Sequence, residues 1–492
     1  MPLLRTCWPS TGAAGEEGSP PPNAGWVWCL LSVLDLAIVV TVGATLAFIL
    51  CGPVETWLFS IKGASKPSLQ AFVLAAVRSG IRRDSWLTAA LTAACAAVTE
   101  GHRSLSRGSA WAPALTDAAI AVVSTRLATT AVGFAANLAF PTLIQRSMVT
   151  PFDAAKFAET FAAWDSAWYL DIAQTGYVFR PDSQSNIAFF PLYPVLIRTL
   201  AFPFGGTERA AWLSGIVISY VCFFAALVLL HRLTEHMAGR REAARRAVLY
   251  AAVFPFSFPF TRIYAESLFL LVSVAAVWLA VLGRWSWAGV CGALAALTRP
   301  NGILIAIPLG LMALRSGGGV KMISRRIVAL QMVPAGLGAY CLFAFTLSGD
   351  PLAWINAQRH WGYSIGNAPW AIMQGTLETI EAQGLYTYLV SAEGQIYGLS
   401  HALIGLGVIA LIPSIFNRLG VALGCYVAAG ILIPFSSNAL EGIGRYAATL
   451  FPVFMYLGAT VRSRRLHEAL LVGASLWLAL NIALFVTQRP VY

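Results

Sequence analysis

The chain has 492 residues, of which 58% are hydrophobic and only 11% are charged, and its net charge is +11. A soluble protein, in which roughly 25% of residues are charged, cannot bury so much apolar surface, whereas a lipid bilayer solvates it. The Lys and Arg residues gather in short segments between apolar runs, which is typical of membrane proteins and argues against nucleic acid as the partner.

The N-terminal region differs in texture from the rest of the chain. Residues 1–25 are polar, small and rich in Pro and Gly, and they lack the compact apolar core of a signal peptide, so we predict a disordered tail. Residues 26–110 are predicted to be an N-terminal membrane-associated extension, for which the sequence indicates no role. Residues 111–492 are predicted to form the main membrane domain.

Apolar runs of about 20 residues predict membrane-spanning helices along the whole chain. The clear candidates are Trp26–Cys51, Asp117–Leu143, Ala210–Leu230, Tyr264–Leu282, Ile327–Leu347, Leu403–Phe416, Val421–Phe435, Tyr446–Val461 and Ala469–Val486, with a weaker one at Trp86–Val98. Ala247–Phe260 is short and broken by Pro255 and Pro259, and Trp285–Leu314 is long and interrupted by Arg299-Pro300-Asn301-Gly302. These runs predict an all-α polytopic bundle of about 10–12 transmembrane helices.

Basic segments set the orientation of this bundle. These segments, each predicted to be a loop, are Arg232–Arg246, Lys321–Arg326 and Arg462–Arg465, and the positive-inside rule places all three in the cytoplasm. Alternation then puts the remaining loops, with nearly every polar or aromatic cluster, on the opposite, extracytoplasmic or lumenal, face. These loops are Thr150–Ser185, Thr261–Glu266, Asp350–His401 and Ser436–Arg445. The sequence therefore predicts that a functional site, if present, lies on that one face.

The loop Trp164–Tyr177 is the strongest candidate for chemistry. Asp165 lies among Trp164, Trp168 and Tyr169, and such a setting stacks on sugar rings while holding a carboxylate that can act as a general base. Asp171, six residues further on, points away from Asp165 if the segment is helical. The alternative is an interfacial helix with aromatic anchors and incidental acids.

Three arginines lie within or at the edge of apolar runs. Arg126, Arg262 and Arg299 each cost at least about 2.5–3.5 kcal/mol to insert, so each is expected to have a partner. The anionic partner is expected to be Glu266 or a lipid phosphate, which suits the planar guanidinium, and an internal pair of Arg262 with Glu266 is the alternative for that arginine. Arg299 has no acidic neighbour in sequence, which favours a phosphate there.

Further candidates lie on the same predicted face. Two prolines in Asn186–Pro194 are expected to break a helix and form a re-entrant kink. The loop after Asp350 carries Trp354, Gln358, Arg359, His360, Trp361 and Tyr363, as a substrate-covering loop would. His360 is interpreted as a hydrogen-bonding residue rather than a base.

Several kinds of site have no signature in the sequence. There is no Walker A loop, no GxGxxG, no HExxH and no Asp-x-Asp pair, and the eight cysteines are widely spaced. The sequence therefore predicts no metal and no cofactor, and a sugar donor would reach the site through the membrane.

The loop Trp164–Tyr177 followed by NIAFFPLYP resembles the PIG-V family, the second mannosyltransferase of GPI-anchor assembly, and its bacterial relatives. Ser124–Leu127, Tyr264–Ser267 and Thr298–Gly302 are similar to further motifs of that family. The resemblance runs from about residue 117 to the C-terminus. Leu192-Tyr193 replaces the Gly-Phe common in eukaryotic members, which leaves the acceptor open.

The resemblance implies a GT-C architecture and an inverting transfer of mannose from a polyprenyl- or dolichyl-phosphate donor. By motif, Asp165 is the expected base, and Arg126 and Arg299 are the expected phosphate ligands. The other residues expected to line the substrate are Trp164, Trp168, Tyr169, Asp171, Arg262, Tyr264, Glu266, Asn301, His360 and Arg445.

The implied partners are membrane lipids, the lipid-phosphate sugar and a lipid-linked acceptor, with a protein partner left open. The implied location is the plasma membrane of a bacterium or the endoplasmic reticulum membrane of a eukaryote. The alternatives are a lipid-linked-sugar flippase, which needs similar arginines and aromatics but access from both sides, and a non-catalytic subunit.

Overall fold

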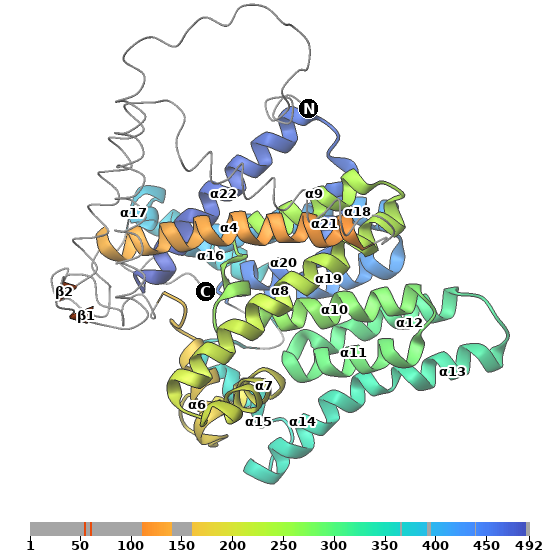
Figure 1. Ribbon diagram of the computed structural model, residues 1–492, viewed down its shortest axis with the longest axis horizontal. Coiled ribbons are helices and arrows are strands. Elements are labelled where there is room, and N and C mark those ends of the chain that lie inside the picture. The colour runs from red at the N-terminus through yellow and green to blue at the C-terminus, as the bar shows by residue number, and fades with distance from the viewer. Residues whose placement is uncertain are drawn as a thin grey trace, which may run out of the picture. The chain divides into compact units, whose positions relative to one another are not determined.

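The computed structural model describes residues 54–55, 60–61, 111–139, 160–364, 367–390, 395–437 and 439–488 (Figure 1). The chain separates into two compact units, Met1–Pro113 with Met148–Ala158, and Ala114–Ser147 with Glu159–Tyr492. In the first unit, β1 (Val54–Glu55) pairs antiparallel with β2 (Ser60–Ile61). The predicted tail and the candidate spans Trp26–Cys51 and Trp86–Val98 lie outside the described residues.

The second unit is built from helices throughout its described part. The α-helices are α4 (Ala112–Ala139), α6 (Ser166–Thr175), α7 (Leu192–Ala201), α8 (Glu208–Ala238), α9 (Arg241–Val253), α10 (Glu266–Val281), α11 (Trp285–Thr298), α12 (Ala306–Arg315), α13 (Val320–Leu330), α14 (Met332–Ser348), α15 (Ala353–Gln358), α16 (Ala371–Gln383), α17 (Leu385–Val390), α18 (Gln395–Leu419), α19 (Val421–Phe435), α20 (Ile443–Thr449), α21 (Phe451–Thr460) and α22 (Arg464–Val486). Short 3₁₀ turns are η1 (Asn186–Ala188), η2 (Phe202–Phe204), η3 (Phe258–Thr261), η4 (Pro300–Ile305) and η5 (Arg359–Trp361).

Five stretches of the described chain are long and apolar enough to cross a bilayer. They are Ala112–Asn137, Glu208–Ala238, Val320–Ser348, Gly398–Leu419 and Arg464–Val486. Shorter apolar helices, among them α10, α11, α12, α19 and α21, pack between these long ones. The prediction of an all-helical polytopic membrane protein is confirmed for this unit.

The Arg299–Gly302 break is confirmed as a structural element. α11 ends at Thr298, η4 follows, and α12 runs from Ala306, so the apolar run is two short helices side by side with α10 (Figure 1). The turn is tight because a Cβ on Gly302 would lie 2.0 Å from the carbonyl oxygen of Ala295. Only glycine allows this approach, and the approach fixes the place of Arg299 between the two helices.

Two local predictions need correction. The prolines of NIAFFPLYP do not break a helix: Pro191 is the N-cap of α7 and Pro194 lies in its first turn, where the missing N–H costs nothing. The arginines of Arg232–Arg246 do not crowd a loop. Arg232 lies near the end of α8, and Arg241, Arg245 and Arg246 lie on α9. Arg240 lies in the two-residue turn between the helices and donates to the carbonyl of Ala459 at the end of α21 (2.7 Å).

Candidate active site

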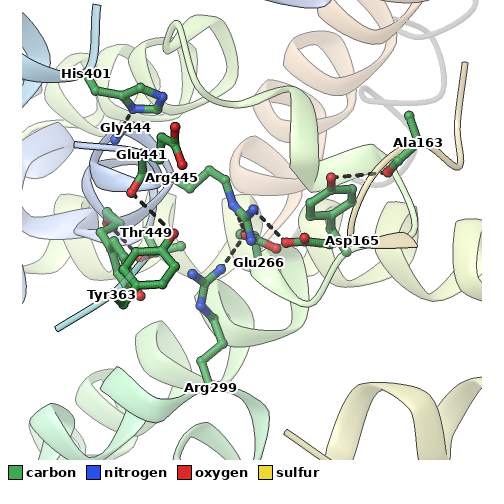
Figure 2. A network of polar contacts seen from close by, with 12 residues as sticks. Ala163, Asp165, Glu266, Arg299, Tyr363, His401, Glu441, Gly444, Arg445 and Thr449 are labelled. Carbon is green, nitrogen blue, oxygen red and sulfur yellow. Dashed lines mark hydrogen bonds and ion pairs between the residues drawn. The ribbon is translucent and has the colours of Figure 1, made fainter. Parts of the chain in front are cut away.

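Four elements far apart in sequence bring a chain of four charged side chains together (Figure 2). Asp165 precedes α6, Glu266 opens α10, Arg299 follows α11, and Arg445 lies in α20. Arg445 Nη1 donates to Asp165 Oδ2 (2.7 Å), and its Nε donates to Glu266 Oε1 (2.7 Å). Arg299 Nη1 forms an ion pair with the same Glu266 oxygen. Glu266 is therefore the junction that holds both guanidinium groups.

Local backbone structure leaves the Asp165 carboxylate free for this network. Asp165 is the N-cap residue of α6, yet its side chain accepts no capping hydrogen bond from that helix. The preceding Trp164 has φ +60°, a conformation that is rare for a bulky residue and costs of order 1–3 kcal/mol. Strain of this kind persists where the surrounding structure requires it, and here it accompanies a carboxylate turned towards Arg445.

A cavity of about 100 Å³ opens against this network. Charged side chains contribute to its lining, and Phe189, Trp361 and Tyr446 contribute aromatic rings. The full lining is Asp165, Tyr169, Ala188, Phe189, Phe190, Thr298, Arg299, Pro300, Gln358, Trp361, Tyr363, Glu441, Gly442, Arg445 and Tyr446. The guanidinium of Arg299 lies 5.2 Å from the Tyr446 ring centroid and that of Arg445 lies 5.0 Å from the Tyr264 ring centroid, so aromatic faces help to orient both cations.

The charges of the network balance. Two guanidinium groups meet two carboxylates, and Glu266 and both arginines are at least nine-tenths buried. A third carboxylate, Glu441, lies exposed at the cavity mouth and forms no ion pair within the described part of the chain. The surrounding protein nevertheless shields Glu441 enough to raise its pKa. An anion that enters must therefore compete with Glu266 or Asp165 for an arginine.

The structure brings most of the predicted site residues to this one place. Asp165, Tyr169, Arg299 and Arg445 line the cavity, and Glu266 lies directly behind them. Tyr264 is buried beside Arg445, and its hydroxyl donates to the carbonyl of Ala163 (3.2 Å). Trp168 stacks on Phe189 (5.7 Å between centroids) and meets Trp361 edge-on, so it supports the aromatic wall from behind.

Arg126, predicted to bind phosphate, lies elsewhere. Its guanidinium is buried and donates to the carbonyls of Ala252 (2.5 Å) and Ser257 (2.9 Å), where α9 ends before Pro255 and Pro259. A helix end leaves its last carbonyls without internal partners, and a buried cation satisfies them. The expected partner of Arg126 is therefore corrected from a phosphate to the backbone of the broken helix.

The ion pair of Arg262 with Glu266 is not formed. Glu266 is occupied by Arg299 and Arg445, while Arg262 is buried against the ring of Phe161, with 4.7 Å from guanidinium to centroid. Arg299 has no acidic neighbour in sequence, but Glu266, one of the two kinds of partner considered for these arginines, reaches it across the fold.

Four other predicted residues lie outside the cavity lining. Asp171 is exposed and accepts hydrogen bonds from Thr175 and from Asn186 (3.3 Å), so it ties α6 to the following loop. His360 is exposed, with its Nε2 3.2 Å from the carbonyl oxygen of Pro181. Asn301 lies in η4, and Trp164 packs against the hydrophobic core.

Glu441 lines the cavity without having been singled out from the sequence, and so do Tyr363, from the predicted substrate-covering loop, and Tyr446, the neighbour of Arg445. Tyr363 donates to the backbone carbonyl of Glu441 (3.4 Å), which joins the loop after α15 to the loop before α20. Burial raises the pKa of Tyr363 above its ordinary value, so it stays a neutral donor. The signal for Glu441 was available: it is one of only 22 acidic residues and lies in a segment assigned to the same face.

The described residues contain no group of three or more His, Cys, Asp or Glu side chains placed to hold a metal ion. The cations of the cavity are the two arginines. Arg299 and Arg445 can therefore supply the positive charge that binds a phosphate in the cavity.

Comparison with known proteins bears on residues 119–316, which match the family model described as Mannosyltransferase (PIG-V). The chain is similar to GPI mannosyltransferase 2 of Yarrowia lipolytica, 25% identical over 171 residues that cover 35% of this chain and 45% of the relative. It is also 28% identical over 185 residues to GPI mannosyltransferase 2 of Schizosaccharomyces pombe, covering 36% and 38% of the two chains. The alignments span less than half the length of either relative, and they confirm the resemblance to the PIG-V family.

A solved structure also aligns with the chain. The apo oligosaccharyltransferase of Archaeoglobus fulgidus superposes with a TM-score of 0.41 and 14% identity, covering 75% of this chain and 56% of that one. The segment matched by the family model contains Asp165, Glu266 and Arg299, whereas Arg445 lies outside it.

Proposed function

We propose that this chain is a membrane glycosyltransferase of GT-C type that transfers a mannosyl or related hexosyl group from a polyprenyl- or dolichyl-phosphate donor to a lipid-linked or glycan acceptor. The observation that carries the proposal is the Asp165–Arg445–Glu266–Arg299 network in an aromatic-walled cavity of a membrane helix bundle. The description of the family model that matches residues 119–316 and the names of the relatives support the sugar as mannose.

In the proposed reaction, Arg299 and Arg445 hold the donor phosphate. Guanidinium groups bind phosphate through paired donors, and they stabilise the charge that grows on the leaving phosphate in the transition state. The donor phosphate replaces the carboxylate of Glu266 or Asp165 at one guanidinium. Binding of the donor therefore breaks one of the internal ion pairs. Trp361 and Phe189 offer rings on which the sugar can stack.

Asp165 acts as the general base of the proposed transfer. It takes the proton of the acceptor hydroxyl, whose oxygen forms a bond to the anomeric carbon as the bond from that carbon to the phosphate oxygen breaks. The leaving group departs as the lipid monophosphate, and a single displacement inverts the anomeric configuration. Arg445 orients the carboxylate through its 2.7 Å contact with Oδ2.

We place the reaction on the extracytoplasmic or lumenal side, in a bacterial plasma membrane or a eukaryotic endoplasmic reticulum membrane. Arg284 lies at the start of α11, and the cavity lies at the end of that helix. Arg325 lies on α13, which precedes α14. Basic residues favour the cytoplasmic side, so we assign the cavity to the other side. We also propose that no metal takes part, since two arginines already supply the positive charge. Activity that survives a chelator such as EDTA is the expected result.

The test uses purified protein in detergent with radiolabelled polyprenyl-phosphate-mannose and a membrane lipid extract. Asp165→Asn is expected to lower the transfer rate about 10²–10⁴-fold, the usual contribution of a general base. Asp171→Asn is the matched control, because Asp171 lies on α6, the helix that Asp165 precedes, and outside the cavity lining, so its rate should stay near that of the wild type.

Two outcomes would contradict the proposal. Full transfer by Asp165→Asn would remove this residue as the base. No transfer by the wild type, with donor binding intact, would favour a flippase or a subunit that needs a partner.

A further inference from the structure

We propose a second anion site at the cytoplasmic end of α11, which binds the phosphate headgroup of an anionic membrane lipid. A cleft of about 700 Å³ lies between the turn that precedes α11 and the helix α13. It is lined by Gly283, Arg284, Trp285, Ser286, Trp287, Met322, Arg325, Arg326 and Ala329.

The charge of this cleft is not compensated. Three of its lining residues are arginines and none is acidic. Arg284 and Arg325 are exposed and form no ion pair within the described part of the chain. This contrasts with the cavity at the other end of α11, where each arginine meets a carboxylate. A cleft with this lining attracts an anion from outside the protein.

One arginine of the cleft is held in place. Arg326 donates to the carbonyls of Gly317 (2.6 Å) and Ala313 (3.3 Å), and its guanidinium lies 5.4 Å from the Trp285 ring centroid. Arg326 is thus a cation with a fixed position in the cleft. The exposed side chains of Arg284 and Arg325 can bind the same ligand from the two elements that carry them. Phosphate suits this arrangement because several guanidinium groups can bind its oxygens together.

The surroundings indicate a lipid rather than a soluble anion. Val320, Val328 and Trp287 are exposed by 82%, 69% and 62%, and they lie on the same two elements as the arginines. Apolar residues and tryptophan beside a basic cluster are typical of the headgroup level of a bilayer. The anionic headgroup of a lipid can bind the arginines of the cleft while its acyl chains cover these apolar side chains.

This site is separate from the proposed donor site. Trp285 and Thr298 are the two ends of α11, and a helix of 14 residues is about 21 Å long, so one phosphate cannot serve both sites. The inference therefore does not depend on the proposed function.

The test measures lipid retention by native mass spectrometry of the full chain in detergent, titrated with phosphatidylglycerol or with phosphatidylcholine. The wild type is expected to retain one phosphatidylglycerol in preference to phosphatidylcholine. Arg284→Gln combined with Arg325→Gln should weaken that binding roughly 30-fold, given the usual contribution of two basic residues at an anionic surface.

The matched control combines Arg462→Gln with Arg465→Gln. Both arginines are exposed and lie outside the cleft, and the two substitutions remove the same charge as those in the cleft. Retention of phosphatidylglycerol should therefore be unchanged. Equal retention of the two lipids, or an equal loss in both double variants, would overturn the site. Displacement of the lipid by millimolar inorganic phosphate would overturn the lipid assignment in favour of a soluble anion.

Discussion

Arg126 and Arg299 lie in two regions that look alike in sequence and differ in structure. Each interrupts an apolar run and each is buried. Arg126 reaches the carbonyls left open where α9 ends, whereas Arg299 reaches the carboxylate of Glu266 and faces a cavity. A buried cation in a membrane protein thus needs acceptors, and a broken helix supplies them as well as an acid or a phosphate does.

The largest expected effect on activity comes from a substitution of Arg299, the arginine that faces the cavity. Arg299→Met removes one of two proposed phosphate ligands and should lower kcat/KM for the lipid-phosphate donor about 10²–10³-fold. The unfolding temperature should change little, because Glu266 keeps its bond to Arg445. Transfer assays beside thermal unfolding in detergent check both points. Loss of folded protein instead of activity would make Arg299 a structural residue like Arg126.

The reverse pattern is expected at Arg126. Arg126→Met leaves the buried carbonyl of Ser257 without its charged donor, which should cost about 1–3 kcal/mol of unfolding free energy. Activity per folded molecule should stay the same, since the side chain does not line the cavity. Thermal unfolding with activity normalised to the folded fraction measures this. A loss of activity at unchanged stability would show that Arg126 contacts the substrate, as the sequence predicted.

A smaller effect is expected from the turn that positions Arg299. Gly302→Ala forces a Cβ against the carbonyl of Ala295, which must shift α11 relative to η4 and should lower activity roughly 10–100-fold. Gly310→Ala is the control, because a Cβ there meets nothing within 4 Å. Rates of the two variants, measured with the same donor, give the answer. Equal rates would show that the exact place of Arg299 does not limit the reaction.

The smallest effect is expected at the cavity mouth. The pKa of Glu441 is raised, so its carboxylate forms only at a higher pH than an ordinary glutamate, and wild-type activity should rise with pH through that raised pKa. In Glu441→Gln the contribution of Glu441 to this rise should disappear, with a rate a few-fold lower at high pH. Glu378→Gln, an exposed change outside the cavity, is the control. An unaltered pH profile in Glu441→Gln would exclude Glu441 from substrate contact.

Sequence reasoning was most successful where a residue and its chemistry share one segment. Asp165 with its aromatic neighbours, and Arg299 with Gly302, were recognisable because the motif itself sets the local structure. Long apolar runs likewise predict spanning helices, since the bilayer fixes their length.

The pairing of charges could not be predicted in the same way. Glu266 lies four residues from Arg262, yet it binds Arg299 and Arg445, and the latter is 179 residues away. Such choices depend on how α10, α11 and α20 pack, which no local pattern records. The same holds for Arg126, whose backbone acceptors exist only because α9 ends where it does.

The shortness of α11 has a consequence for the depth of the chemistry. With 14 residues it is about 21 Å long, while the hydrocarbon layer of a bilayer is about 30 Å thick. If Trp285 sits at one water boundary, Arg299 stops about 9 Å short of the other. A lipid phosphate must then sink below its ordinary level to reach Arg299, or the bilayer must become thinner around the protein. Membrane thickness would then set how readily the donor is captured.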